Sequence, residues 1–274
     1  MFTKNTKRGA KARKPAKILA GSGGAPPSPP AAARRGPGRP RGITEQGAAA
    51  RRQLYETAIA LIASRGYEAT TLRDIAKRAG VSAGLLYRYF PHKRAVILAL
   101  YDELSAAYAT RAAAMPAGTW SARFLFALRT SLGVLGPQRD TLAALTPVLI
   151  GTAEEGMFAP GTAFSRRRVQ TVFFQAVCGA SDAPDPDDAA ALARLLYVAH
   201  LAVILWWLFD KTPRQRATRD LVALLASALP MAALALRIEP VRGFVRTADI
   251  LCRDGLFGDD EEPAAAAQPA QEEV

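Results

Sequence analysis

The chain has 274 residues, half of them hydrophobic, so it can bury the cores of two modest domains or of one domain with tails. Ala and Leu dominate and β-branched runs are few, which favours an all-α fold. The two cysteines and two histidines are too few and too scattered for a disulfide framework or a structural metal site. We therefore expect a protein of the reducing cytoplasm that holds no metal and no cofactor.

The net charge of +12 is unevenly distributed along the chain. Residues 1–42 carry eleven basic residues and no acidic one, whereas residues 258–274 carry six acidic residues and no basic one. Their composition predicts a disordered basic arm over residues 1–44 and a disordered acidic tail over residues 258–274. A basic arm beside a moderately basic body favours binding to a polyanion, although such an arm can also serve solubility alone.

The basic arm contains a short motif at residues 38–41, Gly-Arg-Pro-Arg, that resembles the core of an AT-hook. Proline keeps the backbone extended, so Arg39 and Arg41 can enter a narrow minor groove of DNA. An inert solubilising linker is the alternative. The apolar residues 18–20 are too few for an export signal, so we do not expect export.

Residues 45–108 are expected to form a helical DNA-binding domain. An apolar stripe predicts a first helix over residues 47–64. Residues 71–90 then predict two short helices joined by a tight turn. Thr70 or Thr71 can cap the first helix, Gly80 can end it in the left-handed conformation, and Ser82 can cap the second. The second helix presents small, hydroxylated and basic side chains, which the major groove of DNA accepts.

This region resembles the DNA-binding domain of the TetR-type (tetracycline repressor-like) transcriptional regulators. The resemblance covers about a fifth of the chain. It rests on many residues at fixed offsets, among them Leu-Ile-Ala-Ser-Arg-Gly-Tyr at 61–67, Asp-Ile-Ala at 74–76, Ala-Gly-Val-Ser at 79–82 and Leu-Tyr-Arg-Tyr-Phe at 86–90. The chain departs from the family at Arg94, where Glu is usual, and at Leu85, where Thr is common. The arginine is expected to add charge near the DNA phosphates.

The resemblance implies a set of DNA-contacting residues in this chain. They are Thr71, Ser82, Ala83, Gly84, Tyr87, Tyr89 and Lys93. Thr71 and Lys93 stand at helix starts, where a hydroxyl, an N–H or an ammonium group can meet phosphate. Ala83 and Gly84 allow a close approach to base edges, and Tyr87 can donate to the backbone or pack on a thymine methyl. Core packing is the alternative for both tyrosines, and Arg88 is expected to meet phosphate or solvent.

Residues 109–257 are expected to form a larger helical effector-binding and dimerisation domain. Glycine and proline breaks divide this region into predicted helices over residues 120–135, 137–153, 161–178, 186–210, 213–237 and 243–253. The helix over residues 93–112 leads into it from the DNA-binding domain. In the family this helix links the two domains, so we expect it to transmit the effect of a ligand.

The segment 192–209 is the most apolar part of the chain. About fifteen apolar residues are fewer than a membrane span needs, and His200 lies among them, so a buried helix is favoured over a membrane helix. The resemblance implies that this helix and the next one pair with their copies in a second subunit. The residues of the next helix that fit this role are Leu221, Leu224, Leu225, Ala228, Leu229 and Ala232.

Other chemistry-bearing residues leave alternatives open. The run Arg-Arg-Arg at 166–168 is expected to be a solvated helix face, with an anionic effector or salt bridges as alternatives. His200 is expected to be a satisfied core residue rather than a ligand contact. Trp120, Trp206 and Trp207 either pack at interfaces or line an effector cavity. No phosphate loop, carboxylate pair or nucleophile elbow emerges, so we do not expect an enzyme.

These observations predict an all-α protein with an N-terminal three-helix helix-turn-helix domain and a larger helical C-terminal domain. Its expected function is that of a ligand-responsive repressor that binds double-stranded DNA at a palindromic operator as a homodimer. The small-molecule effector stays unidentified. The alternatives are an architectural, nucleoid-type DNA-binding protein that acts through its basic arm without an effector, and a membrane-associated helical protein.

Overall fold

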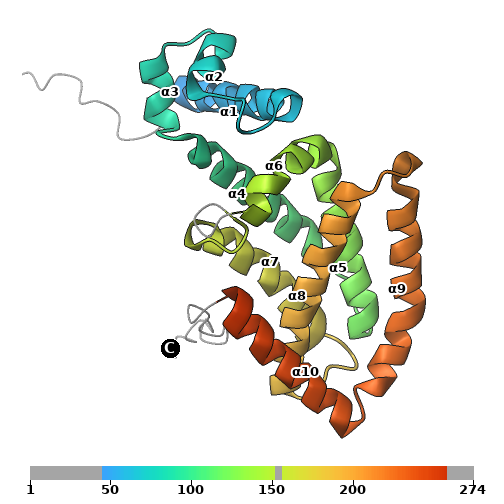
Figure 1. Ribbon diagram of the computed structural model, residues 1–274. Coiled ribbons are helices and arrows are strands. Elements are labelled where there is room, and N and C mark those ends of the chain that lie inside the picture. The colour runs from blue at the N-terminus through green and yellow to red at the C-terminus, as the bar shows by residue number, and fades with distance from the viewer. Residues whose placement is uncertain (1–44, 152–155, 258–274) are drawn as a thin grey trace, which may run out of the picture. The chain divides into compact units, whose positions relative to one another are not determined.

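The computed structural model describes residues 45–151 and 156–257, which contain helices and no strand (Figure 1). The α-helices are α1 (Glu45–Arg65), α2 (Leu72–Ala79), α3 (Ala83–Tyr89), α4 (Lys93–Ala112), α5 (Trp120–Leu135), α6 (Arg139–Gly151), α7 (Ala163–Cys178), α8 (Pro186–Phe209), α9 (Arg216–Ala235) and α10 (Glu239–Cys252). Short helical turns are η1 (Gly136–Gln138), η2 (Pro160–Thr162), η3 (Pro213–Gln215) and η4 (Arg253–Phe257). The predicted all-α fold is confirmed. The predictions for the basic arm, including Arg39 and Arg41, and for the acidic tail lie outside the described residues.

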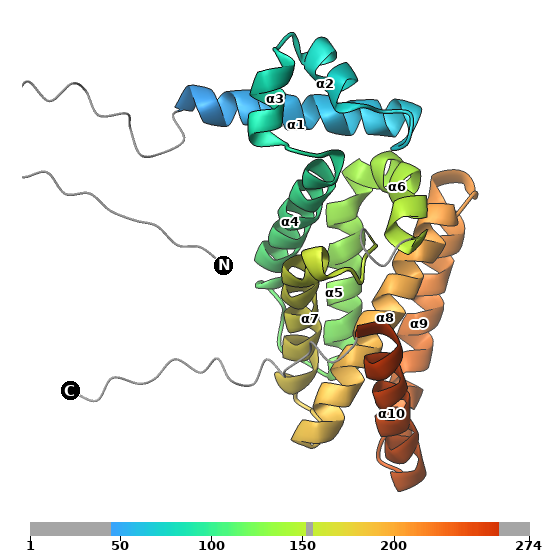
Figure 2. The ribbon, with the colours of Figure 1, turned by 60° about the vertical axis from the view of Figure 1, so that its left-hand side comes forward.

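Helices α1, α2 and α3 lie together at one end of the described region, and α4 leads from them to α5 and α7 (Figures 1 and 2). Helix α1 packs on α2 and also on α6, and α7 packs on α4, α5 and α8. Helix α4 therefore begins beside the helix-turn-helix and ends among the helices of the larger region, as the sequence predicts. The boundaries of the two predicted domains stay a prediction.

The helix ends agree with the predicted ones to within four residues, and three of the differences have a local cause. Helix α6 begins at Arg139 because Gly136–Gln138 forms a separate 3₁₀ turn. Helix α9 begins at Arg216 because Arg214 and Gln215 have positive φ values of 55° and 51° and break the helix after Pro213. Helix α10 begins at Glu239, earlier than predicted, and has proline in its first turn. Proline is tolerated there because the N–H groups of the first turn have no helical partner.

The buried apolar side chains form two clusters. The first joins the core of α1, α2 and α3 to the start of α4, to α6 and to the end of α8; Ile62, Ile97, Leu145 and Trp207 belong to it. The second lies among α5, α7, α8 and the later half of α4, around Phe124 and Phe173. The helix-turn-helix therefore shares its core with two helices of the larger region.

Helices α8 and α9 are both long and apolar enough to cross a membrane by length and composition alone. Much of α8 is buried inside the protein, whereas little of α9 is. An exposed apolar stripe also runs along α8; it consists of Ala202, Leu205, Trp206 and Phe209. Helix α8 thus has one face in the core and one apolar face in solvent, which agrees with the predicted pattern of a helix that is apolar nearly all round.

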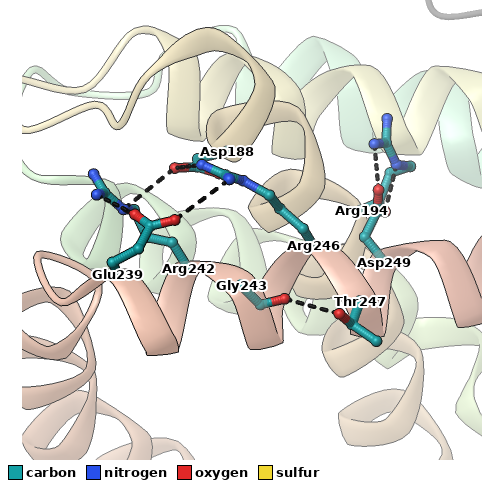
Figure 3. Close-up of polar contacts among 8 residues, drawn as sticks. All are labelled: Asp188, Arg194, Glu239, Arg242, Gly243, Arg246, Thr247 and Asp249. Carbon is teal, nitrogen blue, oxygen red and sulfur yellow. Dashed lines mark hydrogen bonds and ion pairs between the residues drawn. The ribbon is translucent and has the colours of Figure 1, made fainter.

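Helix α10 is held against α8 by two buried carboxylates (Figure 3). Asp188, at the start of α8, accepts hydrogen bonds from Nε and Nη2 of Arg246 and lies 3.8 Å from Nε of Arg242. Asp249 of α10 accepts two hydrogen bonds from Arg194 of α8, with Nε–Oδ1 at 2.6 Å. Bidentate arginine–carboxylate pairs fix both distance and orientation, so they define where α10 lies.

We predict that Asp188→Asn lowers the free energy of unfolding by about 1–2 kcal/mol, because the carboxylate is 4% exposed and its loss leaves the half-exposed Arg246 with Glu239 alone, at 3.6 Å, as an ion-pair partner. The hydrogen bonds from Arg246 lower the pKa of Asp188 below its ordinary value of 3.8. The carboxylate therefore stabilises the fold above that ordinary value and loses this effect as the pH falls through the lower pKa of the folded state. Urea unfolding at pH 7 and across the acid range would measure both effects.

The matched control is Glu239→Gln, which removes an exposed carboxylate from the same cluster and should change the stability by less than about 0.5 kcal/mol. An Asp188→Asn protein as stable as the unaltered chain at pH 7 would contradict this account of α10.

Candidate DNA-binding surface and ligand cavity

The start of α2 is fixed by Thr71 and Asp74. The Thr71 hydroxyl accepts a hydrogen bond from Asp74 N at 3.1 Å, and the Thr71 N–H donates to the Asp74 carboxylate at 3.1 Å, which completes a capping box. The Thr71 hydroxyl also donates to Asp74 Oδ2 at 2.6 Å, and these hydrogen bonds lower the pKa of Asp74. Both Thr71 donors thus serve the helix start, so a phosphate contact through them requires the capping box to open.

The turn between α2 and α3 agrees with the sequence prediction. Gly80 adopts the left-handed conformation with φ of 68°, which an L-residue with a Cβ adopts only at a cost. Ser82 caps α3 by accepting a hydrogen bond from Leu85 N at 3.2 Å. Gln53 of α1 donates to the carbonyl of Ala79 at 3.2 Å and so ties the end of α2 to α1.

The exposed side of α3 contains most of the predicted DNA contacts. Ser82, Ala83 and Gly84 are exposed at its start, and Tyr87 is 46% exposed. Tyr89 is partly buried and packs against the first apolar cluster. Core packing, the alternative to a DNA contact, is therefore part of the role of this residue. The small residues at the start of α3 leave its backbone open to a close approach, and Tyr87 projects beside them.

Lys93, at the start of α4, is engaged within the protein. Its Nζ donates to the carbonyl of Tyr67 at 2.7 Å, lies 3.9 Å from the centre of the Tyr67 ring and is 3.8 Å from Glu68. These contacts hold the α1–α2 loop against α4. An ammonium group has three hydrogens, so the bond to Tyr67 leaves capacity for a phosphate contact.

Arg94 does not simply add charge at the DNA-facing side, as the sequence suggested. A methyl group added at Gly161 would lie 2.7 Å from Arg94 Nη2, so the guanidinium lies directly against the backbone of η2. The residue before it, Lys93, bonds to the carbonyl of Tyr67 in the helix-turn-helix region. Two adjacent residues of α4 therefore contact the helix-turn-helix region and the larger helical region. Arg94 and Gly161 are 67 positions apart, so no local sequence pattern indicates their contact.

Three exposed basic residues of α2 are absent from the predicted DNA contacts: Arg73, Lys77 and Arg78. Arg88 of α3 is exposed as well, in agreement with the expectation that it meets phosphate or solvent. The three residues of α2 could have been found from the amphipathic pattern of this helix, whose apolar residues Ile75, Ala76 and Ala79 are buried on the opposite face. Such basic side chains contact phosphates and contribute the salt-dependent, sequence-independent part of DNA affinity.

A cavity of about 170 Å³ lies among α4, α5, α6, α7 and α8, where the two apolar clusters meet. Leu142 and Leu208 line it from the first cluster, and Tyr108 and Tyr197 line it from the second. An apolar cavity of roughly 150 Å³ is large enough to bind a benzene-sized molecule. The cavity therefore has the size and lining of a small-molecule site.

Several buried polar side chains line this cavity, and three of them, Tyr108, Arg166 and His200, have a nitrogen or oxygen atom without a described partner. Arg166 of α7 is 7% exposed, and its Nη1 makes only long contacts, of 3.4 and 3.5 Å, with the carbonyls of Met157 and Ala159. His200 of α8 is 4% exposed, and its Nε2 lies 2.8 Å from the Ser131 hydroxyl. Burial lowers the pKa of His200 to about 3, so the ring is neutral at physiological pH. Among the described residues, Arg166 Nε, His200 Nδ1 and the Tyr108 hydroxyl have no hydrogen-bond partner.

The expectations for the larger region hold in part. The arginine run is not a single solvated face, because only Arg167 is exposed; Arg166 is buried and Arg168 pairs with Asp102 at 2.9 Å. His200 is a core residue with one hydrogen bond, and it also lines the cavity. Trp120 and Trp207 pack in the core and Trp206 is exposed, and none of the three lines this cavity.

Sequence comparison identifies the family of this chain. Residues 54–100 match the family model described as bacterial regulatory proteins, tetR family. The repressor KstR of Mycolicibacterium smegmatis is 30% identical over 175 residues, which cover 61% of this chain and 79% of KstR. The chain belongs to the TetR family. It therefore acts as a DNA-binding transcriptional regulator, the function that defines this family.

A second relative is similar in a shorter segment. The regulator YuxN of Bacillus subtilis is 43% identical over 49 residues, which cover 18% of this chain but only 17% of YuxN. Solved TetR-type structures share the fold. FadR of Bacillus subtilis, in complex with stearoyl-CoA, covers 64% of this chain with a TM-score of 0.52 and 18% identity over 97% of its own length. A regulator from Streptomyces coelicolor covers 77% of this chain and 94% of its own, with a TM-score of 0.51 and 23% identity.

We predict that Tyr87→Ala weakens specific DNA binding about tenfold and leaves the melting temperature nearly unchanged, because the side chain is exposed on α3 and a base contact contributes about 1–3 kcal/mol. Fluorescence anisotropy with a labelled operator duplex would measure the affinity. Phe244→Ala, which removes an exposed aromatic ring from α10, is the matched control and should leave the affinity unchanged. Equal affinities of all three proteins would remove Tyr87 from the site.

Proposed function

We propose that this TetR-family protein is a ligand-responsive repressor of the cytoplasm that binds a palindromic operator as a homodimer. The observation that carries the proposal is the combination in one chain of an exposed recognition helix, an apolar cavity and a core cluster that joins the two. The DNA-contacting residues are proposed to be those given by the family resemblance, with Ser82, Ala83, Gly84 and Tyr87 at the major groove. Arg39 and Arg41 are proposed to reach the adjacent minor groove.

Two copies of the chain are proposed to meet through α8 and α9. The stripe of α8 ends at Trp206 and Phe209, which line one shallow pocket together with Ala217 at the start of α9. Along α9, Leu224 is 64% exposed and Met231 lies seven residues later on the same helical face, also exposed. Exposed apolar side chains that continue from one helix to the next are typical of a subunit interface. Of the residues that the resemblance placed in this role, Leu229 is buried in the protein's own core, and Leu221 and Leu225 are partly buried and pack against that core.

A ligand in the cavity is proposed to control DNA binding through α4 and α6. Helix α6 lines the cavity with Leu142, Thr146, Leu149 and Ile150, and the same helix packs on α1 of the helix-turn-helix. Helix α4 lines the cavity with Tyr101 and Tyr108 and begins at Lys93. A ligand that prefers one arrangement of these helices by only 1–3 kcal/mol changes operator affinity by the corresponding factor.

The full chain should bind a palindrome from the DNA near its own gene much more tightly than a random duplex. Several phosphate contacts predict a steep salt dependence, with affinity falling about 10³-fold or more between roughly 50 and 200 mM salt. Electrophoretic mobility shift and anisotropy titrations at several salt concentrations would measure both quantities. Equal affinity for random duplex, or a flat salt dependence, would contradict the proposal.

Deleting residues 1–42 distinguishes this function from that of an architectural DNA-binding protein. Specific binding that survives the deletion supports the helix-turn-helix as the reader of sequence, with a smaller salt slope because eleven basic residues are gone. Complete loss of DNA binding would favour the architectural function. Solubility without detergent would separate both from a membrane-associated protein.

We predict that Leu224→Glu or Met231→Glu converts the dimer to a monomer and reduces operator affinity at least tenfold, because a charge placed in an apolar interface must be desolvated. Sedimentation velocity would measure the oligomeric state. Phe164→Glu places the same charge at an exposed apolar residue of α7, outside this interface, and should leave the dimer intact. Dimers of all three variants would show that another surface joins the subunits.

A further inference from the structure

We infer that the cavity accepts an amphiphile with an apolar body and one carboxylate, and that Arg166 binds the carboxylate. This inference rests on the proposed function, which requires a small-molecule effector, and it specifies the chemistry of that effector.

Arg166 lies in an unusual environment for a charged side chain. A guanidinium is always charged, and burying a charge without an ionic partner is costly. Arg166 is 7% exposed and forms no ion pair with any described residue. Its Nη1 contacts with two carbonyls, at 3.4 and 3.5 Å, are at the outer limit of hydrogen bonding, and its Nε has no partner among the described residues. Its neighbour Arg168, in contrast, pairs with Asp102.

The lining of the cavity carries little charge. Arg166 is the only charged side chain among the described residues that line it, and no described Asp or Glu does. The remaining wall consists mainly of leucine, isoleucine and aromatic side chains. A single cation in an apolar wall matches a ligand with one negative charge, because a doubly charged phosphate would need a second buried cation.

Two further polar groups of the same wall could contact the ligand. The Tyr108 hydroxyl and His200 Nδ1 are buried and have no partner among the described residues. The hydroxyl can donate to a ligand oxygen. His200 Nδ1 also becomes a donor when the Ser131 hydroxyl donates to Nε2, and burial keeps this ring neutral. The cavity thus offers donors from α4, α7 and α8 to a ligand oxygen in a space that is mainly apolar, and buried donors favour a ligand that satisfies them.

The test uses the full-length protein with matched pairs of ligands: butanoate, octanoate and dodecanoate against butanol, octanol and dodecanol. Thermal shift would select the best-bound chain length, and isothermal titration calorimetry would give its affinity. We expect the carboxylate to bind about tenfold more tightly than the alcohol of equal length, because a hydrogen bond to a charged group contributes about 1.5–3 kcal/mol. An alcohol that binds as tightly, or no binding by any carboxylate, would overturn the inference.

Arg166→Gln should abolish the preference for carboxylate over alcohol, whereas Arg167→Gln, which removes an exposed charge from the adjacent position, should keep it. If Arg166 only organises residues 157–159, Arg166→Gln will weaken both ligands equally, and the inference is wrong. Where Arg166→Gln fails to fold, Arg166→Lys keeps the charge without the planar fork and should reduce the preference.

Operator binding separates this inference from the proposed function. Release of operator DNA by octanoate but not by octanol in a mobility-shift assay supports both. Release by the alcohol alone leaves the repressor function standing and overturns the carboxylate specificity. A protein that shows no sequence-specific DNA binding overturns the proposed function, whatever the calorimetry of the carboxylates shows.

Discussion

The packing of α1 on α6 is the contact on which the rest of this structure depends. A domain of one long helix, α1, and two short ones has a small apolar core, and here Ile62 and Ile97 share one cluster with Leu145 of α6 and Trp207 of α8. The apolar core beneath the DNA-binding helices therefore includes side chains from the region that contains the cavity. Leu142 and Leu208 belong to this cluster and also line the cavity, so the two sites have side chains in common. A change at the cavity wall is then also a change in the core of the helix-turn-helix.

Sequence reasoning predicts the parts of the molecule that depend on local chemistry. Gly80 and Ser82 specify the turn before α3 because a left-handed position and a helix cap need those residue types, and the structure has both. Arg214 and Gln215 have positive φ values although their residue types do not favour them. The sequence therefore predicts the start of α9 too early. The binding partners of Lys93 and Arg166, and the packing of Arg94 on Gly161, depend on folding that brings distant residues together. The residue type indicates that these side chains are charged, but it does not indicate which residues they contact.

The junction of α8 and α9 connects the proposed dimer surface to the same core. Arg139, at the start of α6, donates to the carbonyls of Trp207, Leu208 and Asp210, and so satisfies the end of α8, whose last carbonyls have no helical partner. The Asp210 carboxylate accepts hydrogen bonds from Thr212 and Thr218 and so caps the start of α9; these bonds hold its pKa well below the usual range. One arginine thus ties α6, which supports the helix-turn-helix, to the two helices of the proposed interface.

The position of Arg166 gives the cavity a short connection to α4. Its guanidinium lies near the carbonyls of Met157 and Ala159, in the segment that leads into η2, and η2 contains Gly161, against which Arg94 packs. A carboxylate that binds Arg166 competes with these long carbonyl contacts, because a charged acceptor forms the stronger bond. The segment that loses them also supports the first turn of α4, one residue from Lys93. The proposed carboxylate site and the helix-turn-helix are thus joined by contacts among a few adjacent residues, in addition to the shared apolar core.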